Sequence, residues 1–134
     1  MGFLLDTNII SDLVRHPAGR VAERIAQVGE QQICTSIIVA AELRYGAIKR
    51  ASAHLAAQLE AVLGAIPVLP LESPSEVGYG TLRMQLEKRG RPIGANDLLI
   101  AAQALALGHT LVTDNTKEFS YVPELPLENW LRDG

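Results

Sequence analysis

The chain has 134 residues, of which 48% are hydrophobic, so it can bury one sizeable core and is too apolar to be disordered. Twelve Lys and Arg against fifteen Asp and Glu leave a formal net charge of -3, which taken alone argues against a nucleic-acid partner. A lone cysteine excludes an internal disulfide, and no apolar stretch approaches the roughly 18 residues of a membrane span. We therefore expect a single domain over residues 1–134, located in the cytoplasm and without a membrane partner.

Short apolar segments alternate with longer segments of helical periodicity, which is typical of an α/β domain with a mainly parallel sheet. The predicted strands, in chain order, are residues 2–5, 32–35, 68–69, 110–113 and 127–128. Apolar residues three or four positions apart predict helices that include residues 21–28, 55–66, 79–86 and 98–105, with another beginning near Ile37. The expected caps are Thr35 or Ser36 for the helix at Ile37, Ser73 for the third periodic segment and Gly108 at the end of the fourth.

Four acidic residues stand at or near the ends of predicted strands, where a parallel sheet binds its ligands. Asp6 follows the first strand, Glu42 lies on the helix after the second, Asp97 begins the helix before the fourth, and Asp114 follows the fourth. Each of them alone also fits a turn, a helix cap or a surface position. If they converge, their mutual repulsion favours a bound divalent cation, and oxygen ligands without Cys or His spacing indicate Mg²⁺ or Mn²⁺. Such a site is typical of phosphoryl transfer with a metal-activated water as nucleophile.

Four motifs carry a family resemblance along essentially the whole chain. They are Leu4-Leu5-Asp6-Thr7-Asn8; Thr35-Ser36 with Ala41-Glu42-Leu43 and Gly46; Arg91-Pro92-Ile93-Gly94 with Asp97 and Ile100-Ala101-Ala102; and the segment 111–119. In this order they resemble PIN-domain ribonucleases, in particular the VapC toxins of bacterial VapBC toxin–antitoxin pairs. The resemblance implies a three-layer α/β/α domain with a five-stranded mainly parallel sheet, and Mg²⁺- or Mn²⁺-dependent cleavage of RNA.

The resemblance also implies roles for the four acids. Asp6 and Asp97 correspond to the principal metal ligands, and Glu42 to a further catalytic acid that binds metal or orients water. Asp114 corresponds to the fourth acid, although many relatives carry that acid where this chain has Asn115. All four are therefore expected to be catalytic.

Residues close to these acids in the sequence are expected to bind the substrate. They are Arg44, Arg91, Thr113 and Asn115. The arginines would contact phosphates without reading the RNA sequence, and a Pro-Gly turn holds Arg91 beside Asp97. Without the four site acids the rest of the chain is slightly basic, so the negative net charge does not exclude RNA.

The family resemblance further implies a homodimer and a tight complex with a VapB antitoxin whose C-terminal segment occludes the acidic cleft. The forms Arg-Pro-Ile-Gly and Thr-Asp-Asn-Thr-Lys-Glu-Phe resemble the branch that cuts initiator tRNA in its anticodon loop. Two alternatives remain. A HAD-like phosphohydrolase needs a second Asp where this chain has Asn8. A non-catalytic α/β partner-binding domain would show no Mg²⁺-dependent RNA cleavage.

Overall fold

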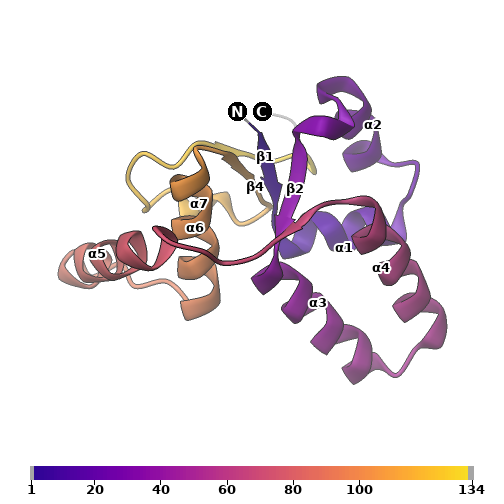
Figure 1. The fold of residues 1–134 in the computed structure, drawn as a ribbon, viewed down its shortest axis with the longest axis horizontal. Coiled ribbons are helices and arrows are strands. Elements are labelled where there is room, and N and C mark those ends of the chain that lie inside the picture. Colours follow the sequence, from indigo (N-terminus) through magenta and orange to yellow (C-terminus); the bar gives the residue numbers. More distant parts are fainter. Residues whose placement is uncertain (1, 133–134) are drawn as a thin grey trace.

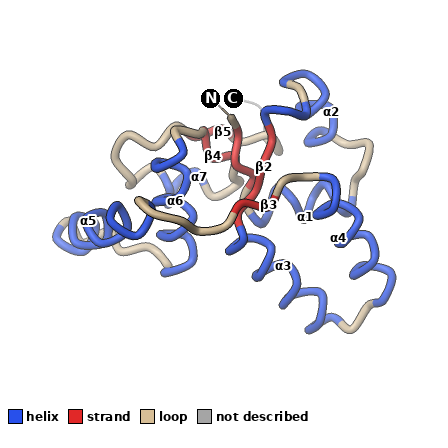
Figure 2. Tube along the Cα trace, in the orientation of Figure 1, coloured by secondary structure: helices blue, strands red, loops and turns tan. Residues whose placement is uncertain are grey.

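Short apolar segments pair as a five-stranded parallel sheet in the computed structural model, which describes residues 2–132. The strands, drawn in red in Figure 2, are β1 (Phe3–Leu5), β2 (Ile33–Ser36), β3 (Val68–Leu69), β4 (Thr110–Val112) and β5 (Leu127–Glu128). Their spatial order is β3-β2-β1-β4-β5. The central strands are buried on both faces, which explains why they read as continuous apolar runs. The predicted sheet is confirmed.

Helices cover both faces of the sheet and complete the three layers. They are α1 (Thr7–Arg15), α2 (Arg20–Val28), the 3₁₀ turn η1 (Glu30–Gln32), α3 (Ile37–Arg50), α4 (Ala53–Ala65), α5 (Ser75–Lys88), α6 (Ala95–Leu107) and α7 (Thr116–Phe119). In Figure 1, α1, α2 and α4 lie on one side of the sheet, and α5, α6 and α7 on the other. No helix within residues 2–132 is long and apolar enough to cross a membrane.

The helix caps only partly follow the sequence prediction. Ser36 caps α3 by accepting a hydrogen bond from the Ile38 N–H (3.0 Å), and Gly108 ends α6 with a φ of 68°. Thr35 is not a cap, because it lies in β2 and its hydroxyl donates to the Leu5 carbonyl (2.7 Å). Ser73 is not one either, since α5 begins at Ser75 without a side-chain cap. Helices α1 and α7 were not predicted.

The order of the strands determines where a ligand can approach. The chain runs from β1 through β2 to β3 on one side of the sheet, then places β4 and β5 on the other side of β1. The carboxyl ends of β1 and β4 therefore border the point at which the winding direction switches, where open parallel sheets bind ligands. The Asp6 N–H donates to the Val112 carbonyl (2.9 Å) and holds these two strand ends together.

Candidate active site

Asp6 is the most deeply buried acid of the site, with 4% of its surface exposed. It follows β1 and caps α1, where one carboxylate oxygen accepts a hydrogen bond from the Thr7 N–H (2.8 Å). The other oxygen accepts one from the Thr113 hydroxyl at the end of β4 (2.7 Å). Burial raises the pKa of Asp6, and these two hydrogen bonds oppose the rise. The carboxylate is thus fixed in orientation between the two central strands.

Glu42 lies beside Asp6 because Thr7 contacts both. The Thr7 hydroxyl donates to Glu42 Oε1 (2.9 Å), while its backbone N–H donates to Asp6. Glu42 Oε2 accepts a longer hydrogen bond from the Asn96 side chain in the first turn of α6 (3.5 Å). Glu42 also raises the pKa of Asp6 by charge repulsion. Three helices, α1, α3 and α6, therefore meet at this carboxylate.

Asp97 joins the same group from the first turn of α6. Its pKa is raised from 3.8 to about 6, first by burial and then by the negative charges of Asp6, Glu118 and Glu42. A hydrogen bond with the Glu118 carboxyl raises the pKa of Asp97 further. Asp97 is therefore in electrostatic contact with every other acid of the group.

Glu118 is the acid that sequence reasoning missed. It lies on the single-turn helix α7, where its Oε2 accepts a hydrogen bond from the Asn115 side chain (3.0 Å). Its charge raises the pKa of both Asp6 and Asp97. The available signal was the spacing of Glu118 three residues after Asn115, which places the two side chains on one face of a helical turn. The structure thus groups Asp6, Glu42, Asp97 and Glu118, called the acidic site below.

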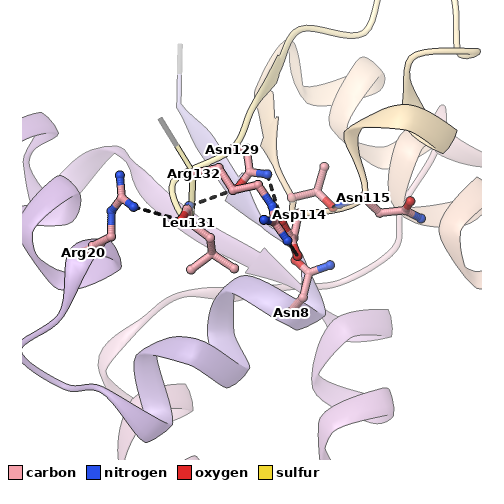
Figure 3. Close-up of polar contacts among 8 residues, drawn as sticks. Asn8, Arg20, Asp114, Asn115, Asn129, Leu131 and Arg132 are labelled. Atoms are coloured by element: carbon pink, nitrogen blue, oxygen red, sulfur yellow. Dashed lines mark hydrogen bonds and ion pairs between the residues drawn. The ribbon is translucent and has the colours of Figure 1, made fainter. Parts of the chain in front are cut away.

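Asp114 contacts residues near the C-terminal end of the described chain, and Figure 3 shows its carboxylate beside Asn129 and Arg132. Its carboxylate accepts hydrogen bonds from Arg132 Nε (2.8 Å) and from the Asn129 side chain (2.9 Å), and its N–H donates to Asn8 Oδ1 (3.0 Å). Arg132 and Asn129 lower the pKa of Asp114, opposite to the rise at Asp6 and Asp97. The expected fourth acid therefore anchors the C-terminal segment to β4.

Thr113 and Asn115, predicted to bind substrate, flank Asp114 but face the acidic site. Thr113 donates its hydroxyl proton to Asp6, and the same hydroxyl oxygen accepts a hydrogen bond from the Asn115 N–H (3.0 Å). The Asn115 side chain then reaches Glu118. These residues form a hydrogen-bonded connection from Asp6 to Glu118 across the end of β4.

The two predicted phosphate-binding arginines occupy different environments. Arg44 forms a bidentate ion pair with Glu60 on α4, with Nε–Oε2 and Nη2–Oε1 distances of 3.0 and 2.9 Å. The structure does not bring it to the acidic site. Arg91 lies in the loop that leads into α6, and its guanidinium covers the Tyr121 ring at 4.9 Å from the ring centroid.

Within the described residues 2–132, no cationic side chain forms an ion pair with the acidic site. Ion pairs within residues 2–132 are made by Glu60, Glu87, Asp114 and Glu128, and by none of the four acids. Nor do three acids, histidines or cysteines among the described residues stand close enough to enclose a metal ion. Carboxylate, hydroxyl and amide oxygens without compensating charge fit Mg²⁺ or Mn²⁺, which use few protein ligands and retain water. The chemistry of the donor set therefore fits such a cation.

Comparison with known proteins points to one family. The family model described as "PIN domain" matches residues 3–125. The chain is 39% identical over 132 residues to "Ribonuclease VapC2" of Rickettsia felis, covering 97% of this chain and 98% of the relative. It is 34% identical over 129 residues to "tRNA(fMet)-specific endonuclease VapC" of Shigella flexneri, covering 96% and 97% respectively.

A solved structure has the same fold over the same length. The crystal structure of VapBC2 from Rickettsia felis, bound to a DNA fragment from its promoter, contains a chain that superposes with a TM-score of 0.88. The two chains are 36% identical, and the match covers 97% of this chain and 99% of the other. Sequence and structure therefore agree along nearly the entire chain.

Proposed function

The chain belongs to the PIN-domain family, and on that premise we propose that it is a divalent-metal-dependent endoribonuclease of the VapC type. The observation that carries the proposal is the acidic site at the switch point of the sheet, where burial and the charges of neighbouring carboxylates raise the pKa values of Asp6 and Asp97 and no cation of residues 2–132 forms an ion pair with the four acids. Such repulsion disfavours the metal-free folded state, and a divalent cation would relieve it.

In this proposal Asp6 and Asp97 hold the metal ion, and Glu42 and Glu118 complete the site. Mg²⁺ or Mn²⁺, when bound, supplies positive charge for the reacting phosphate and lowers the pKa of a water molecule. Thr7 and Thr113 keep the Asp6 carboxylate in place through their hydrogen bonds. Glu118 replaces Asp114 as the fourth acid, because Asp114 is neutralised by Arg132.

The chain's own residues would place the RNA strand as well as the metal. Asn115 lies between Asp6 and Glu118, where its side chain can meet a phosphate or a water molecule. Thr113 is fully buried and its hydroxyl is engaged by Asp6 and Asn115, so it holds these residues in place and does not contact the RNA. Asn96 and Thr7 orient Glu42 towards the same space. Direct attack of water on phosphorus leaves 5′-phosphate and 3′-hydroxyl ends, and the ribose 2′-hydroxyl takes no part.

The biological role proposed for the chain is that of a toxin held inactive by a VapB antitoxin. Support comes from the solved relative, which is a VapBC complex. Initiator tRNA is the proposed substrate, because the Shigella flexneri relative is named as specific for tRNA(fMet). The homodimer remains a prediction, which light scattering on the purified protein would test. Neither the HAD-like phosphohydrolase nor the non-catalytic partner-binding domain gains support. Asn8, which stands where the phosphohydrolase needs a second Asp, accepts a hydrogen bond from the Asp114 N–H, and the relatives are ribonucleases.

An RNA cleavage assay tests this function. Purified protein is incubated with initiator tRNA transcribed in vitro, with Mg²⁺, with Mn²⁺ or with EDTA, and the ends of the products are mapped. We expect cleavage with either metal, none with EDTA, and 5′-phosphate with 3′-hydroxyl ends. Products ending in 2′,3′-cyclic phosphate, or cleavage that persists in EDTA, would show that the metal-dependent mechanism is wrong.

A further inference from the structure

The contact between Arg91 and Tyr121 joins the two segments that carry Asp97 and Glu118. Arg91 stands in the loop between α5 and α6, where its N–H donates to the Leu86 carbonyl (2.9 Å). Tyr121 follows α7, and its N–H donates to the Glu118 carbonyl (3.2 Å). The Arg91 guanidinium lies 4.9 Å from the centroid of the Tyr121 ring. The contact is therefore built from the same two segments as one side of the acidic site.

Stacking on a ring leaves the hydrogen-bonding edge of a guanidinium available. Arg91 is exposed and makes no ion pair within residues 2–132, whereas several other arginines are paired with carboxylates. The half-buried Tyr121 ring takes up the flat face of the group, and the N–H donors at its edge remain. A guanidinium held in this way loses less conformational freedom when it binds two oxygens of a phosphate.

We propose that Arg91 and Tyr121 form a phosphate-binding site for the RNA strand beside the acidic site, with Tyr121 as the positioning residue. The proposal rests on the proposed function. The four carboxylates repel an RNA backbone, so a fixed cation on the loop that leads into α6 offsets part of that repulsion. Contacts of this kind hold the strand in register without reading its bases.

Binding measurements on single and double variants test the pair. The probe is a fluorescein-labelled single-stranded RNA of mixed sequence, and binding is followed by anisotropy over a range of salt concentrations. An Asp97→Asn background without metal prevents cleavage and removes one repelling charge. We expect Arg91→Gln to weaken binding about 5- to 10-fold and to reduce the slope of log K against log salt by about 0.7, the loss of one phosphate contact.

Replacement of the ring separates its role from that of the charge. Tyr121→Leu is expected to weaken binding about 3- to 5-fold and to reduce the same salt slope, although Arg91 keeps its charge. Tyr121→Phe retains the ring and is expected to bind like the parent. The double variant Arg91→Gln, Tyr121→Leu is expected to bind no worse than Arg91→Gln alone, because the two residues act as one unit.

Arg89→Gln is the matched control. Arg89 is exposed in the same loop region, and within residues 2–132 it makes no cation–π contact with an aromatic ring. Equal effects of Arg89→Gln and Arg91→Gln would overturn the proposal and indicate only a general charge effect. A Tyr121→Leu variant that lowers the Tm but leaves affinity and salt slope unchanged would overturn it too. Cleavage by the wild type together with unchanged binding by Arg91→Gln refutes this inference alone, whereas RNA binding without cleavage by the wild type in Mg²⁺ refutes the proposed function alone.

Discussion

Replacement of Asp97 by asparagine is expected to stabilise the metal-free protein while it removes a proposed metal ligand. The pKa of Asp97 is raised to about 6 because burial and three neighbouring carboxylates disfavour its charged form. Asparagine carries no charge and can donate a hydrogen bond to Glu118, as the protonated acid does. The substitution therefore removes a repulsion that exists at neutral pH and retains the contact.

The size of this effect follows from the pKa. Raising a pKa from 3.8 to about 6, at about 1.4 kcal/mol per unit, sets an upper limit of about 3 kcal/mol. Asp97 is partly exposed to solvent, which screens its charge, so we expect about 1–2 kcal/mol. At about 3–4 °C per kcal/mol for a domain of this size, the Tm rises by about 3–8 °C. The pKa of Asp97 is higher in the folded than in the unfolded state, so its ionisation destabilises the folded protein. This destabilisation is absent below pH 3.8, develops between pH 3.8 and 6, and is complete above pH 6.

Thermal unfolding of wild type and Asp97→Asn in EDTA at pH 7.5 and near pH 4 measures this difference. The variant should be the more stable protein at pH 7.5 and nearly equal to wild type near pH 4. Addition of Mg²⁺ should then raise the Tm of wild type much more than that of the variant. Asp12→Asn, on α1 and outside the acidic site, controls for loss of a carboxylate in general. A variant that is no more stable than wild type at pH 7.5, or equally stabilised at both pH values, would refute the reasoning.

Two further predictions concern residues around the acidic site. Thr113→Val removes the hydroxyl that donates to Asp6 (2.7 Å), so it should raise the pKa of Asp6 further and move the acidic limb of the cleavage pH profile to higher pH. Thr110→Val, at a buried threonine of β4, is the control, and an unchanged profile in both variants would contradict this role. Arg44→Gln should leave the KM for RNA unchanged, because Arg44 is engaged by Glu60 on α4. A several-fold rise in the KM of Arg44→Gln, with Glu60→Gln measured alongside, would instead indicate that Arg44 contacts the RNA.

Much of the fold could be predicted because its signals are local. Short apolar runs separated by helical periodicity determine the sheet, and the ends of the parallel strands indicate where Asp6, Glu42 and Asp97 stand. Helix α1 was not predicted, although a helix cap was one of the roles that the sequence left open for Asp6. Its side chain does cap α1, by accepting the Thr7 N–H.

Local signals alone do not decide which carboxylate is the fourth acid. Asp114 follows β4 as the pattern requires, but its direction depends on Arg132 and Asn129, which reach it from the far end of the chain. Glu118 lies on a helix of a single turn, too short to show a periodicity. Only the folded arrangement of the chain brings it to Asp97 in the first turn of α6. Long-range contacts, rather than residue type, decide between these two carboxylates.

The central claim is that Asp6, Glu42, Asp97 and Glu118 together form the catalytic site and that Asp114 lies outside it. The most direct test is the kcat/KM for Mg²⁺-dependent RNA cleavage by Glu118→Gln and Asp114→Asn, measured side by side with wild type. We expect Glu118→Gln to lower kcat/KM by about 10- to 100-fold or more, as for loss of a group that supports a metal site, and Asp114→Asn to lower it less than about 3-fold. The reverse order, with Asp114→Asn inactive and Glu118→Gln near wild type, would contradict the site described by this structure.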